Sequence, residues 1–321
     1  MRAVGIILAG GNNNRMKELT HKRAVAAMPI AGSYRSIDFA LSNMTNSHIQ
    51  KVAVLTQYNA RSLNEHLNSS KWWNFGRKQG GLYVFTPTIT NDNGYWYRGT
   101  ADAIYQNMDF LKKSHEPYVV IASGDAVYKM DYSKVLQYHI DKKADVTVVC
   151  KEMDPSDDVS RFGTIRMDDD MRITEFEEKP MVTKSNMIST GIYVIRRRLL
   201  IDLIEHAAEE ERFDFVNDVL IRYKNLKKIY GYKIDHYWSN IATVDAYYKT
   251  NMDFLKPEVR NYFFKQDPEI YSKVSDLPPA KYNPGASVKN SLVGSGSIIN
   301  GTVENSVIFK QVFVGNNCVI K

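Results

Sequence analysis

The stretch AVGIILAGGNNNRM, residues 3–16, decides the fold of this chain. Its apolar first half predicts a buried strand, and the adjacent Gly10 and Gly11 predict a loop directly after it. In an open parallel sheet such a loop lies at the carboxyl edge, where small residues let a phosphate approach backbone N–H groups. Arg15 adds a planar cation that suits polyphosphate oxygens. The glycines alone fit an ordinary turn between a strand and a helix equally well.

Length and composition exclude several classes of protein. A chain of 321 residues suits one large α/β domain with a smaller second domain. The 42 Lys and Arg residues are scattered among 36 acidic ones, so we expect no nucleic-acid partner despite the net charge of +6. Cys150 and Cys318 form neither a disulfide framework nor a zinc motif. Because no signal-peptide core or membrane-spanning run is present, the sequence predicts a cytoplasmic protein without a membrane partner.

Strand-like and helix-like segments alternate over the first two thirds of the chain. Short β-branched runs predict strands covered on both faces at residues 52–55, 118–122 and 146–149. Amphipathic segments predict helices at residues 37–47, 101–111, 132–142 and 243–255. This alternation is typical of an α/β fold with a doubly wound, mostly parallel sheet. After residue 168 the pattern becomes more antiparallel, with alternating segments at residues 172–177 and 191–195.

The C-terminal part has a different pattern. Recurring prolines predict a linker at residues 256–285, between a first domain of residues 1–255 and a second of residues 286–321. In the second domain apolar residues recur every six positions, with one break in phase: Ala286, Leu292 and Ile298, then Val307, Phe313 and Val319. A further apolar residue directly follows each member of the second set and shadows the pattern: Ile308, Val314 and Ile320. This period predicts a parallel β-helix of three-sided coils, and unrelated short strands are the alternative. The repeat ends without a capping coil, which predicts a shortened chain or a partner over the open end.

Three further motifs are candidates for chemistry. Asp125 follows the strongest central strand, where a lone carboxylate can hold Mg²⁺ together with substrate phosphates or simply cap a turn. Gly99-Thr100-Ala101 begins a helix whose N–H groups could meet a base or a phosphate, or whose Thr100 is only a cap. In Glu177-Glu178-Lys179-Pro180 a cation between acids suits a phosphate monoester, and a surface ion pair is the alternative.

These motifs occur together with others in a fixed order. They are LAGG (8–11) followed by Arg15, RSIDFALSN (35–43), VLTQY (54–58), WYRGTADAIYQN (96–107), SGDAVYKMDY (123–132), EFEEKP (175–180) and STGIYVI (189–195). Together they resemble the ADP-glucose pyrophosphorylases, also called glucose-1-phosphate adenylyltransferases, over essentially the whole chain. The resemblance implies a Rossmann-like sugar-nucleotidyltransferase domain followed by a left-handed parallel β-helix of hexapeptide repeats.

The resemblance also implies a reaction in glycogen biosynthesis and a set of residues. With Mg²⁺ as cofactor, the phosphate of α-D-glucose 1-phosphate attacks the α-phosphorus of ATP and expels diphosphate, which yields ADP-glucose. Arg15 and Asp125 would be catalytic, and Asp125 would hold the metal. The nucleotide site would comprise Leu8, Ala9, Gly10, Gly11, Gln57 (reading the adenine), Gly99, Thr100 and Ala101. The sugar-phosphate site would comprise Glu178, Lys179, Ser189 and Gly191. Trp96 and Tyr97 would couple the allosteric effector site to the ATP site.

The chain departs from the family pattern at the reactive centre. In the loop GGNNNR, Asn13 replaces a glycine, although Asn tolerates a positive φ. Val25 replaces the lysine that would neutralise the transferring phosphate. Asn240 replaces an aspartate that would be the second magnesium ligand. We do not expect Asp245, on the following helix, to compensate for this loss.

The sequence therefore supports three hypotheses. The favoured one is a GlgD-type regulatory subunit of low intrinsic activity, which tunes a catalytic homologous subunit in a hetero-oligomer, expected to be a tetramer. The apolar Val25 and the neutral Asn240 favour it. The second is a fully active adenylyltransferase that relies on Asp125, Arg15 and Lys179. The third is a non-enzymatic β-helix assembly protein with a vestigial nucleotide domain.

Overall fold

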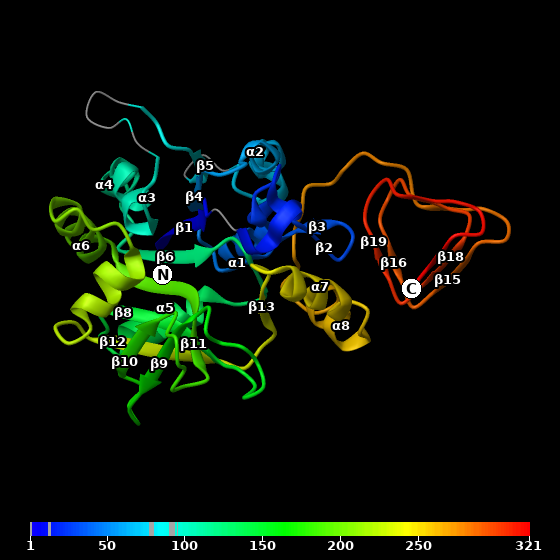
Figure 1. The fold of residues 1–321 in the computed structure, drawn as a ribbon. Coiled ribbons are helices and arrows are strands. Elements are labelled where there is room, and N and C mark those ends of the chain that lie inside the picture. The colour runs from blue at the N-terminus through cyan, green and yellow to red at the C-terminus, as the bar shows by residue number, and fades with distance from the viewer. Residues whose placement is uncertain (1, 12–13, 77–79, 90–93, 95) are drawn as a thin grey trace.

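The computed structural model describes residues 2–11, 14–76, 80–89, 94 and 96–321. In this part of the chain, nine strands form one sheet: β10, β9, β11, β6, β1, β4 and β5 are adjacent in that order, β8 pairs with β11, and β12 pairs with β8. Figure 1 shows this sheet with its helices on the left and the C-terminal strands as a triangle on the right. The helices α7 (Val244–Asp253) and α8 (Pro257–Phe264) lie between them.

The first strand lies in the middle of the sheet. β1 (Ala3–Ala9) pairs in parallel with β4 (Lys51–Thr56) on one side and with β6 (Tyr118–Ser123) on the other. β5 (Gly81–Phe85) extends the sheet beyond β4, also in parallel. β1, β4 and β6 are almost wholly buried, as predicted for apolar strands covered on both faces. Their shared direction brings their carboxyl ends to one edge of the sheet.

The second half of the sheet is mixed, as the alternating segments predicted. β11 (Met187–Arg196) runs antiparallel to β6 and to β8 (Val146–Glu152), and its register shifts between Ser189 and Tyr193. Gly191 lies in this shift at φ 75°, a left-handed conformation that favours glycine. The remaining strands are β9 (Gly163–Met167) and β10 (Ile173–Glu178), antiparallel to each other, and β12 (Ile229–Ile234), parallel to β8.

Helices cover both faces of the sheet and create two hydrophobic cores. One core lies between the sheet and the helices α1 (Ser36–Asn46) and α5 (Tyr132–Asp141). The other lies between the sheet and the helices α3 (Thr100–Gln106), α4 (Met108–Lys112) and α6 (Arg197–Glu209). Among the helices of the described ranges, none has the length and apolar character needed to cross a membrane. The smaller elements are α2 (Arg61–Leu67), β2 (Pro29–Ile30), β3 (Tyr34–Arg35), β7 (Ala126–Tyr128) and β13 (Trp238–Asn240).

The helix predicted at residues 101–111 is two helices. It is interrupted at Asn107, whose side-chain Nδ2 donates to the carbonyl oxygen of Ala103 at 2.8 Å and to the hydroxyl of Tyr97 at 2.9 Å. A side chain that bonds to the backbone of the preceding turn competes with helical hydrogen bonding there. Apolar periodicity does not record such a bond, and it therefore predicted one continuous helix.

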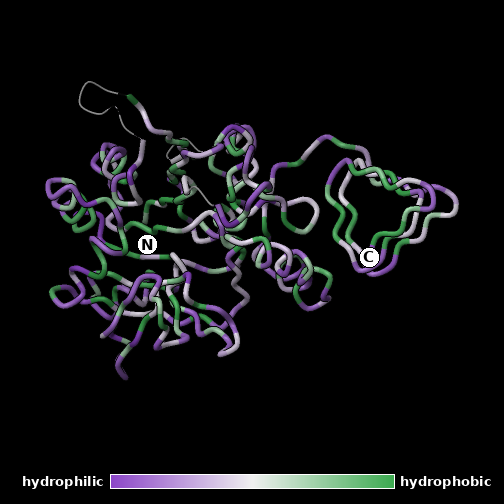
Figure 2. The backbone as a smooth tube through the Cα atoms, in the orientation of Figure 1, coloured by the Kyte–Doolittle hydropathy of each residue, from purple (hydrophilic) through white to green (hydrophobic). Residues whose placement is uncertain are grey.

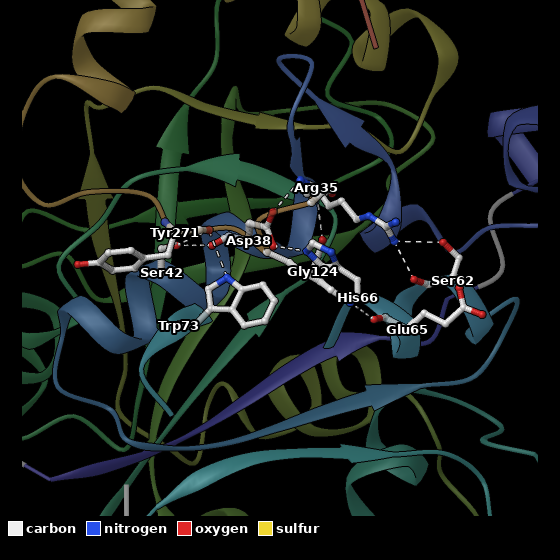
Figure 3. Close-up of polar contacts among 12 residues, drawn as sticks. Arg35, Asp38, Ser42, Ser62, Glu65, His66, Trp73, Gly124 and Tyr271 are labelled. Carbon is white, nitrogen blue, oxygen red and sulfur yellow. Dashed lines mark hydrogen bonds and ion pairs between the residues drawn. The ribbon is translucent and has the colours of Figure 1, made fainter. Parts of the chain in front are cut away.

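A buried carboxylate ties the start of α1 to two other segments (Figure 3). Asp38 accepts a hydrogen bond from the backbone N–H of Arg35 at 2.8 Å and lies 2.6 Å from Nε2 of His66 in α2. Both side chains, Asp38 and His66, are buried. The hydroxyl of Ser36 donates to the carbonyl oxygen of Gly124 at 2.9 Å, which joins the same helix start to the turn after β6.

The stretch predicted to be a linker, residues 256–285, is partly folded into the first domain. Its first residues form α8, which places Phe263 fully inside a core. The ring centroid of Phe263 lies 5.4 Å from that of Phe39 and 5.2 Å from that of Phe254. The prolines that suggested a linker do not interrupt this helix, because Pro257 occupies its first position, where no backbone donor is needed.

A second part of the same stretch is fixed through its backbone (Figure 3). The N–H of Tyr271 donates to Oγ of Ser42 at 2.8 Å, and its carbonyl oxygen accepts from Nε1 of Trp73 at 3.2 Å. The neighbouring Ile270 is buried. The chain therefore crosses the surface of the first domain along α1 before it enters the C-terminal coils.

The C-terminal strands stack as three-sided coils within residues 281–321, all of which are described. Each side is a parallel sheet: β14 (Lys281–Tyr282), β17 (Ile298–Ile299) and β20 (Phe313–Val314); β15 (Ser287–Lys289), β18 (Thr302–Glu304) and β21 (Val319–Ile320); β16 (Leu292–Val293) and β19 (Val307–Ile308). Figure 2 shows apolar segments along the sides of the triangle and polar segments at its right-hand and lower corners. The arrangement is consistent with the predicted β-helix, and its hand stays a prediction.

The six-residue pattern has the wrong phase for the interior of these coils. Ile298, Phe313 and Val319, which it marks, are 38%, 66% and 63% exposed, whereas Ile299 and Val314 are 0% and 2% exposed. Successive side chains of a strand point to opposite faces, and each of these short strands has two adjacent apolar residues. Periodicity alone could not choose between them. Of the residues that shadow the pattern, Ile308 and Val314 are buried in the interior cluster with Ile299 and Val303, and Ile320 packs against that cluster.

The burial of α8 predicts a loss of stability when its central ring is removed. We expect Phe263→Ala to lower the free energy of unfolding by about 3–5 kcal/mol, because the ring is fully buried. Phe313→Ala is the matched control, since that ring is 66% exposed, and its effect should stay within about 0.5 kcal/mol. Urea unfolding followed by tryptophan fluorescence measures both. Equal midpoints for the two variants would contradict the packing described for α8.

A buried histidine predicts that stability falls in acid. His139 in α5 is 1% exposed, its Nδ1 lies 2.9 Å from Oγ1 of Thr147, and its Nε2 has no hydrogen-bond partner in the described residues. Burial, and then the charge of Arg196, lower the pKa of His139 from 6.5 to about 4, against the opposing charge of Asp145. The unfolded chain therefore binds this proton first as the pH falls. The neutral His139 contributes on the order of 3 kcal/mol to the free energy of unfolding above pH 6.5, and this contribution is lost as the pH falls towards about 4.

The measurement is the free energy of unfolding in urea at a series of pH values between 7 and 4. His139→Asn retains a polar group for Thr147 but does not titrate, so its stability should fall less steeply across this range. His115→Asn replaces an exposed histidine and serves as the control. If His139→Asn and the unaltered chain have the same slope, another group causes the pH dependence.

Candidate functional site

A cavity of about 700 Å³ opens at the carboxyl edge of the parallel strands, and we call it the main cavity. Its walls come from the ends of β1, β4 and β6, from β11, and from the segments that follow them. Twelve of the sixteen predicted site residues line it: Leu8, Ala9, Gly10, Gly11, Arg15, Gln57, Tyr97, Gly99, Thr100, Asp125, Lys179 and Gly191. Of the other predicted site residues, Trp96, Ala101, Glu178 and Ser189 lie outside this lining.

The glycine loop after β1 lies beside the end of β4. A Cβ atom on Gly10 would be 3.2 Å from Cβ and 3.3 Å from the backbone N of Gln57, so a larger residue would press on the neighbouring strand. A Cβ atom on Gly11 would meet no atom of the described residues within 4 Å, so among these residues the Cβ side of Gly11 is open. This is the open backbone that the phosphate hypothesis requires. The predicted effect of Asn13 concerns a position outside the described residues.

Gln57 holds the segment that precedes α3. Its Oε1 accepts from the N–H of Tyr97 at 2.6 Å, and its Nε2 donates to the carbonyl oxygen of Tyr97 at 3.2 Å. Both ends of the amide are thus bonded to one backbone residue in this structure. Trp96, next to it, is 62% exposed and stacks on Tyr58 with a centroid distance of 5.9 Å. Gln57 therefore connects an exposed aromatic pair to the wall of the main cavity, and its contact with adenine stays a prediction.

The N-terminus of α3 is closed by another part of the chain. The N–H groups of Ala101 and Asp102 donate to the carbonyl oxygen of Phe213 at 2.7 and 3.3 Å. A Cβ atom on Gly99 would lie only 2.3 Å from that oxygen, so the approach requires glycine. Oγ1 of Thr100 accepts from the N–H of Phe215 at 2.9 Å and does not cap its own helix. The sequence suggested open N–H groups or a threonine cap, whereas in the structure the N–H groups of Ala101 and Asp102 are bonded to Phe213 and Thr100 is not a cap.

Asp125 directly precedes β7, and Asn240 is the last residue of β13, the strand paired with β7. β13 runs antiparallel to β7, with Asn240 opposite Ala126, and the N–H of Ile241 donates to the backbone oxygen of Asp125 at 3.0 Å. Oδ1 of Asp125 accepts from Oγ of Ser123 at 2.5 Å. Both Asp125 and Asn240 are half-buried and line the main cavity.

The ligands for a cation at this place are few. In the described residues, no three His, Cys, Asp or Glu side chains form a group that could hold a metal ion. Oδ1 of Asn240 already accepts from the N–H of Ala242 at 3.0 Å. Asp245 lines the side cavity and not the main cavity, and the expectation that it does not compensate stays a prediction. One carboxylate together with substrate phosphates still suits Mg²⁺, which keeps most of its water in protein sites.

Val25 is far from Asp125 in the sequence, but it lies in the cavity wall near the turn that carries Asp125. It begins the short 3₁₀ helix Val25–Ala27, is 7% exposed, and packs in an apolar cluster that includes Met16 and Ile241. A Cβ atom on Gly124 would lie 3.2 Å from Cβ of Ala26, so this helix touches the turn that carries Asp125. The side chain of Val25 lines the main cavity, and this part of its wall is therefore apolar.

The predicted sugar-phosphate residues are partly brought together. Lys179 lines the main cavity, is held at φ 47°, and forms an ion pair with Glu178 at 3.0 Å. Glu177 instead pairs with Lys184 at 3.0 Å, so the predicted clamp of one lysine between two acids is half formed. Ser189 lies behind the lining, with its Oγ 3.2 Å from the hydroxyl of Tyr193.

The sequence analysis missed Arg161. This half-buried residue lines the main cavity and also a neighbouring cavity of about 650 Å³, the side cavity, whose walls include Lys151, Asp157, Thr243 and Lys249. A single arginine in a loop between two strands gives no signal in the sequence. Only the fold brings it beside Arg15 and Asp125, with which it interacts electrostatically.

Comparison with known proteins agrees with this geometry. A model of the nucleotidyl transferase family matches residues 4–257. The chain is 40% identical over 320 residues to a protein of Clostridium novyi named glucose-1-phosphate adenylyltransferase, with 99% of this chain and 84% of the relative covered. A protein of the same name from Geobacillus stearothermophilus is 39% identical, with 100% of this chain and 83% of the relative covered. Another from Thermosipho melanesiensis is also 39% identical, with 99% of this chain and 77% of the relative covered. The chain therefore belongs to the glucose-1-phosphate adenylyltransferase family of nucleotidyl transferases.

Proposed function

We propose that this chain is a regulatory subunit of glucose-1-phosphate adenylyltransferase with low intrinsic activity. It binds ATP and glucose 1-phosphate in the main cavity and combines with a catalytic homologous subunit in a hetero-oligomer in the cytoplasm, for glycogen biosynthesis. The observation that carries the proposal is the apolar side chain of Val25 in the cavity wall, beside the turn of Asp125.

The reaction of the family depends on charge neutralisation and alignment. A phosphate oxygen of glucose 1-phosphate forms a bond to the α-phosphorus of ATP while the bond to diphosphate breaks. In this chain the backbone at Gly10 and Gly11 and the guanidinium of Arg15 would bind the triphosphate, and Lys179 the sugar phosphate. Asp125 would hold Mg²⁺, which when bound neutralises phosphate charge.

Two features of the main cavity would make this chain a poor catalyst by itself. An apolar group such as Val25 cannot stabilise the charge that develops on the transferring phosphate, and loss of one such donor costs about 10²–10³ in rate. Asn240 is neutral, and its side-chain oxygen is already bonded to the N–H of Ala242. Most of the residues predicted for the two substrate sites line the main cavity, which supports a subunit that binds ligands and turns them over slowly.

For this chain to regulate a partner subunit, ligand binding in the main cavity would have to alter residues at the protein surface. The exposed stack of Trp96 on Tyr58 is joined to the main cavity through Gln57 and Tyr97. A neighbouring subunit that touches Trp96 would therefore sense whether the cavity is occupied. The C-terminal coils, taken as a left-handed β-helix, offer a second surface for assembly.

Restoring the missing charge should raise activity. We expect Val25→Lys combined with Asn240→Asp to accelerate pyrophosphorolysis of ADP-glucose by up to about 10²–10³-fold over the unaltered chain. Val25→Met with Asn240→Asp is the control, since it lengthens the side chain without adding charge. If the unaltered chain already turns over as fast as a lysine-containing relative, the chain is a fully active adenylyltransferase and the regulatory proposal fails.

Co-expression with a lysine-containing relative tests the partnership. We expect a stable mixed complex whose response to substrate differs from that of the relative alone, measured by size-exclusion chromatography with light scattering and by steady-state kinetics. Absence of a complex, with unchanged kinetics, would contradict the proposal. ATP or glucose 1-phosphate should also raise the melting temperature of the isolated chain, because both bind the folded state. No shift with either ligand would favour the assembly protein with a vestigial nucleotide domain.

A further inference from the structure

Arg161 lies where the main cavity and the side cavity share a wall, together with Arg15, Phe162 and Asn240. It belongs to the loop between β8 and β9 and lines both cavities. Its Nη1 donates to Oγ1 of Thr243 at 2.9 Å, and its Cζ lies 4.8 Å from the ring centroid of Phe162. Thr243 in turn caps α7 by accepting from the N–H of Ala246 at 3.2 Å. The side chain is therefore held in one place by a helix start and an aromatic ring.

Arg161 has no anionic side chain in contact with it in the described part of the chain. No carboxylate there lies within ion-pair distance of it, and its Nε is buried without a hydrogen bond. Asp158, Asp125 and Asp157 act on it only through longer-range electrostatics, and Arg15 adds a like charge. Burial is the largest of the effects that lower the pKa of Arg161, because this cation is partly removed from water. A partly buried cation that lacks a contact anion is a strong binding point for a ligand anion.

The position of Arg161 favours one of the two substrates. The carbonyl oxygen of its neighbour Phe162 accepts from the N–H of Lys179 at 3.2 Å, so Arg161 lies beside the lysine of the sugar-phosphate motif. The glycine loop and Gln57, where the nucleotide is expected, belong to the ends of β1 and β4. Arg161 and Lys179 thus offer two cations to one phosphate, in a cavity to which Val25 contributes none.

We propose that Arg161 binds the phosphate group of the sugar-phosphate substrate in this chain. The planar guanidinium can present two parallel N–H donors to phosphate oxygens, whereas Lys179 acts as a point charge. This inference rests on the proposed function, because it assumes that the isolated chain binds glucose 1-phosphate.

Calorimetric titration of the full chain with glucose 1-phosphate, and separately with ATP, tests the assignment. We expect Arg161→Gln, which keeps a donor for Thr243 but removes the charge, to weaken glucose 1-phosphate binding about 10- to 100-fold and to leave ATP binding within about 3-fold. Arg161→Lys retains the charge and should recover part of the loss. The matched control is Lys249→Gln, which removes an exposed cation from the side cavity only. It should leave both affinities unchanged.

The outcomes separate this inference from the proposed function. If the unaltered chain binds neither ligand, the proposed function itself fails. If it binds both and Arg161→Gln loses no affinity, or loses affinity for ATP alone, the assignment of Arg161 is wrong while the proposed function stands. Equal losses in Arg161→Gln and Lys249→Gln would point to general charge effects and would also overturn the assignment. Melting temperatures of each variant without ligand exclude unfolding as the cause.

Discussion

The structure depends on the double pairing of β1, which is hydrogen-bonded in parallel to β4 on one side and to β6 on the other. A strand enclosed in this way is apolar on both faces. The three strands also end together, with Ala9 opposite Thr56 and Leu8 opposite Ser123. The loops after these strands therefore converge on one edge. That convergence places the glycine loop, Gln57 and Asp125 around a single cavity.

Segments remote in sequence complete the walls of this cavity. The pairing of β13 with β7 brings Asn240 beside Asp125, and Phe213 closes the N-terminus of α3. The hydroxyl of Ser36 fixes the start of α1 to Gly124, while Asp38 and His66 hold the same helix end from the other side (Figure 3). Because buried polar groups must be satisfied, such contacts leave little freedom for the turn that carries Asp125.

Charge is unevenly distributed over the lining of the main cavity. Arg15, Arg98, Arg161 and Lys179 all line it, whereas the wall at Val25 is apolar. Charge placed this way can hold anionic ligands without concentrating on the phosphorus that would react. Binding and turnover are separable properties in such a site, and a subunit that binds without reacting quickly can report ligand occupancy to a neighbour.

Twelve of the residues that line the cavity were expected from the sequence, several of them, such as Gln57 and Gly191, only through the family resemblance. The sequence by itself determined the local elements: the buried strands, the amphipathic helices and the loop after β1. These follow from short-range pattern, since periodicity and glycine positions are properties of adjacent residues. Only the tertiary structure decided the inward phase of the C-terminal coils, the docking of α8, the break at Asn107 and the closure of α3 by Phe213. It also placed Arg161 in the cavity. Each of these depends on contacts between residues far apart in the chain, or on one side-chain hydrogen bond, which local pattern cannot encode.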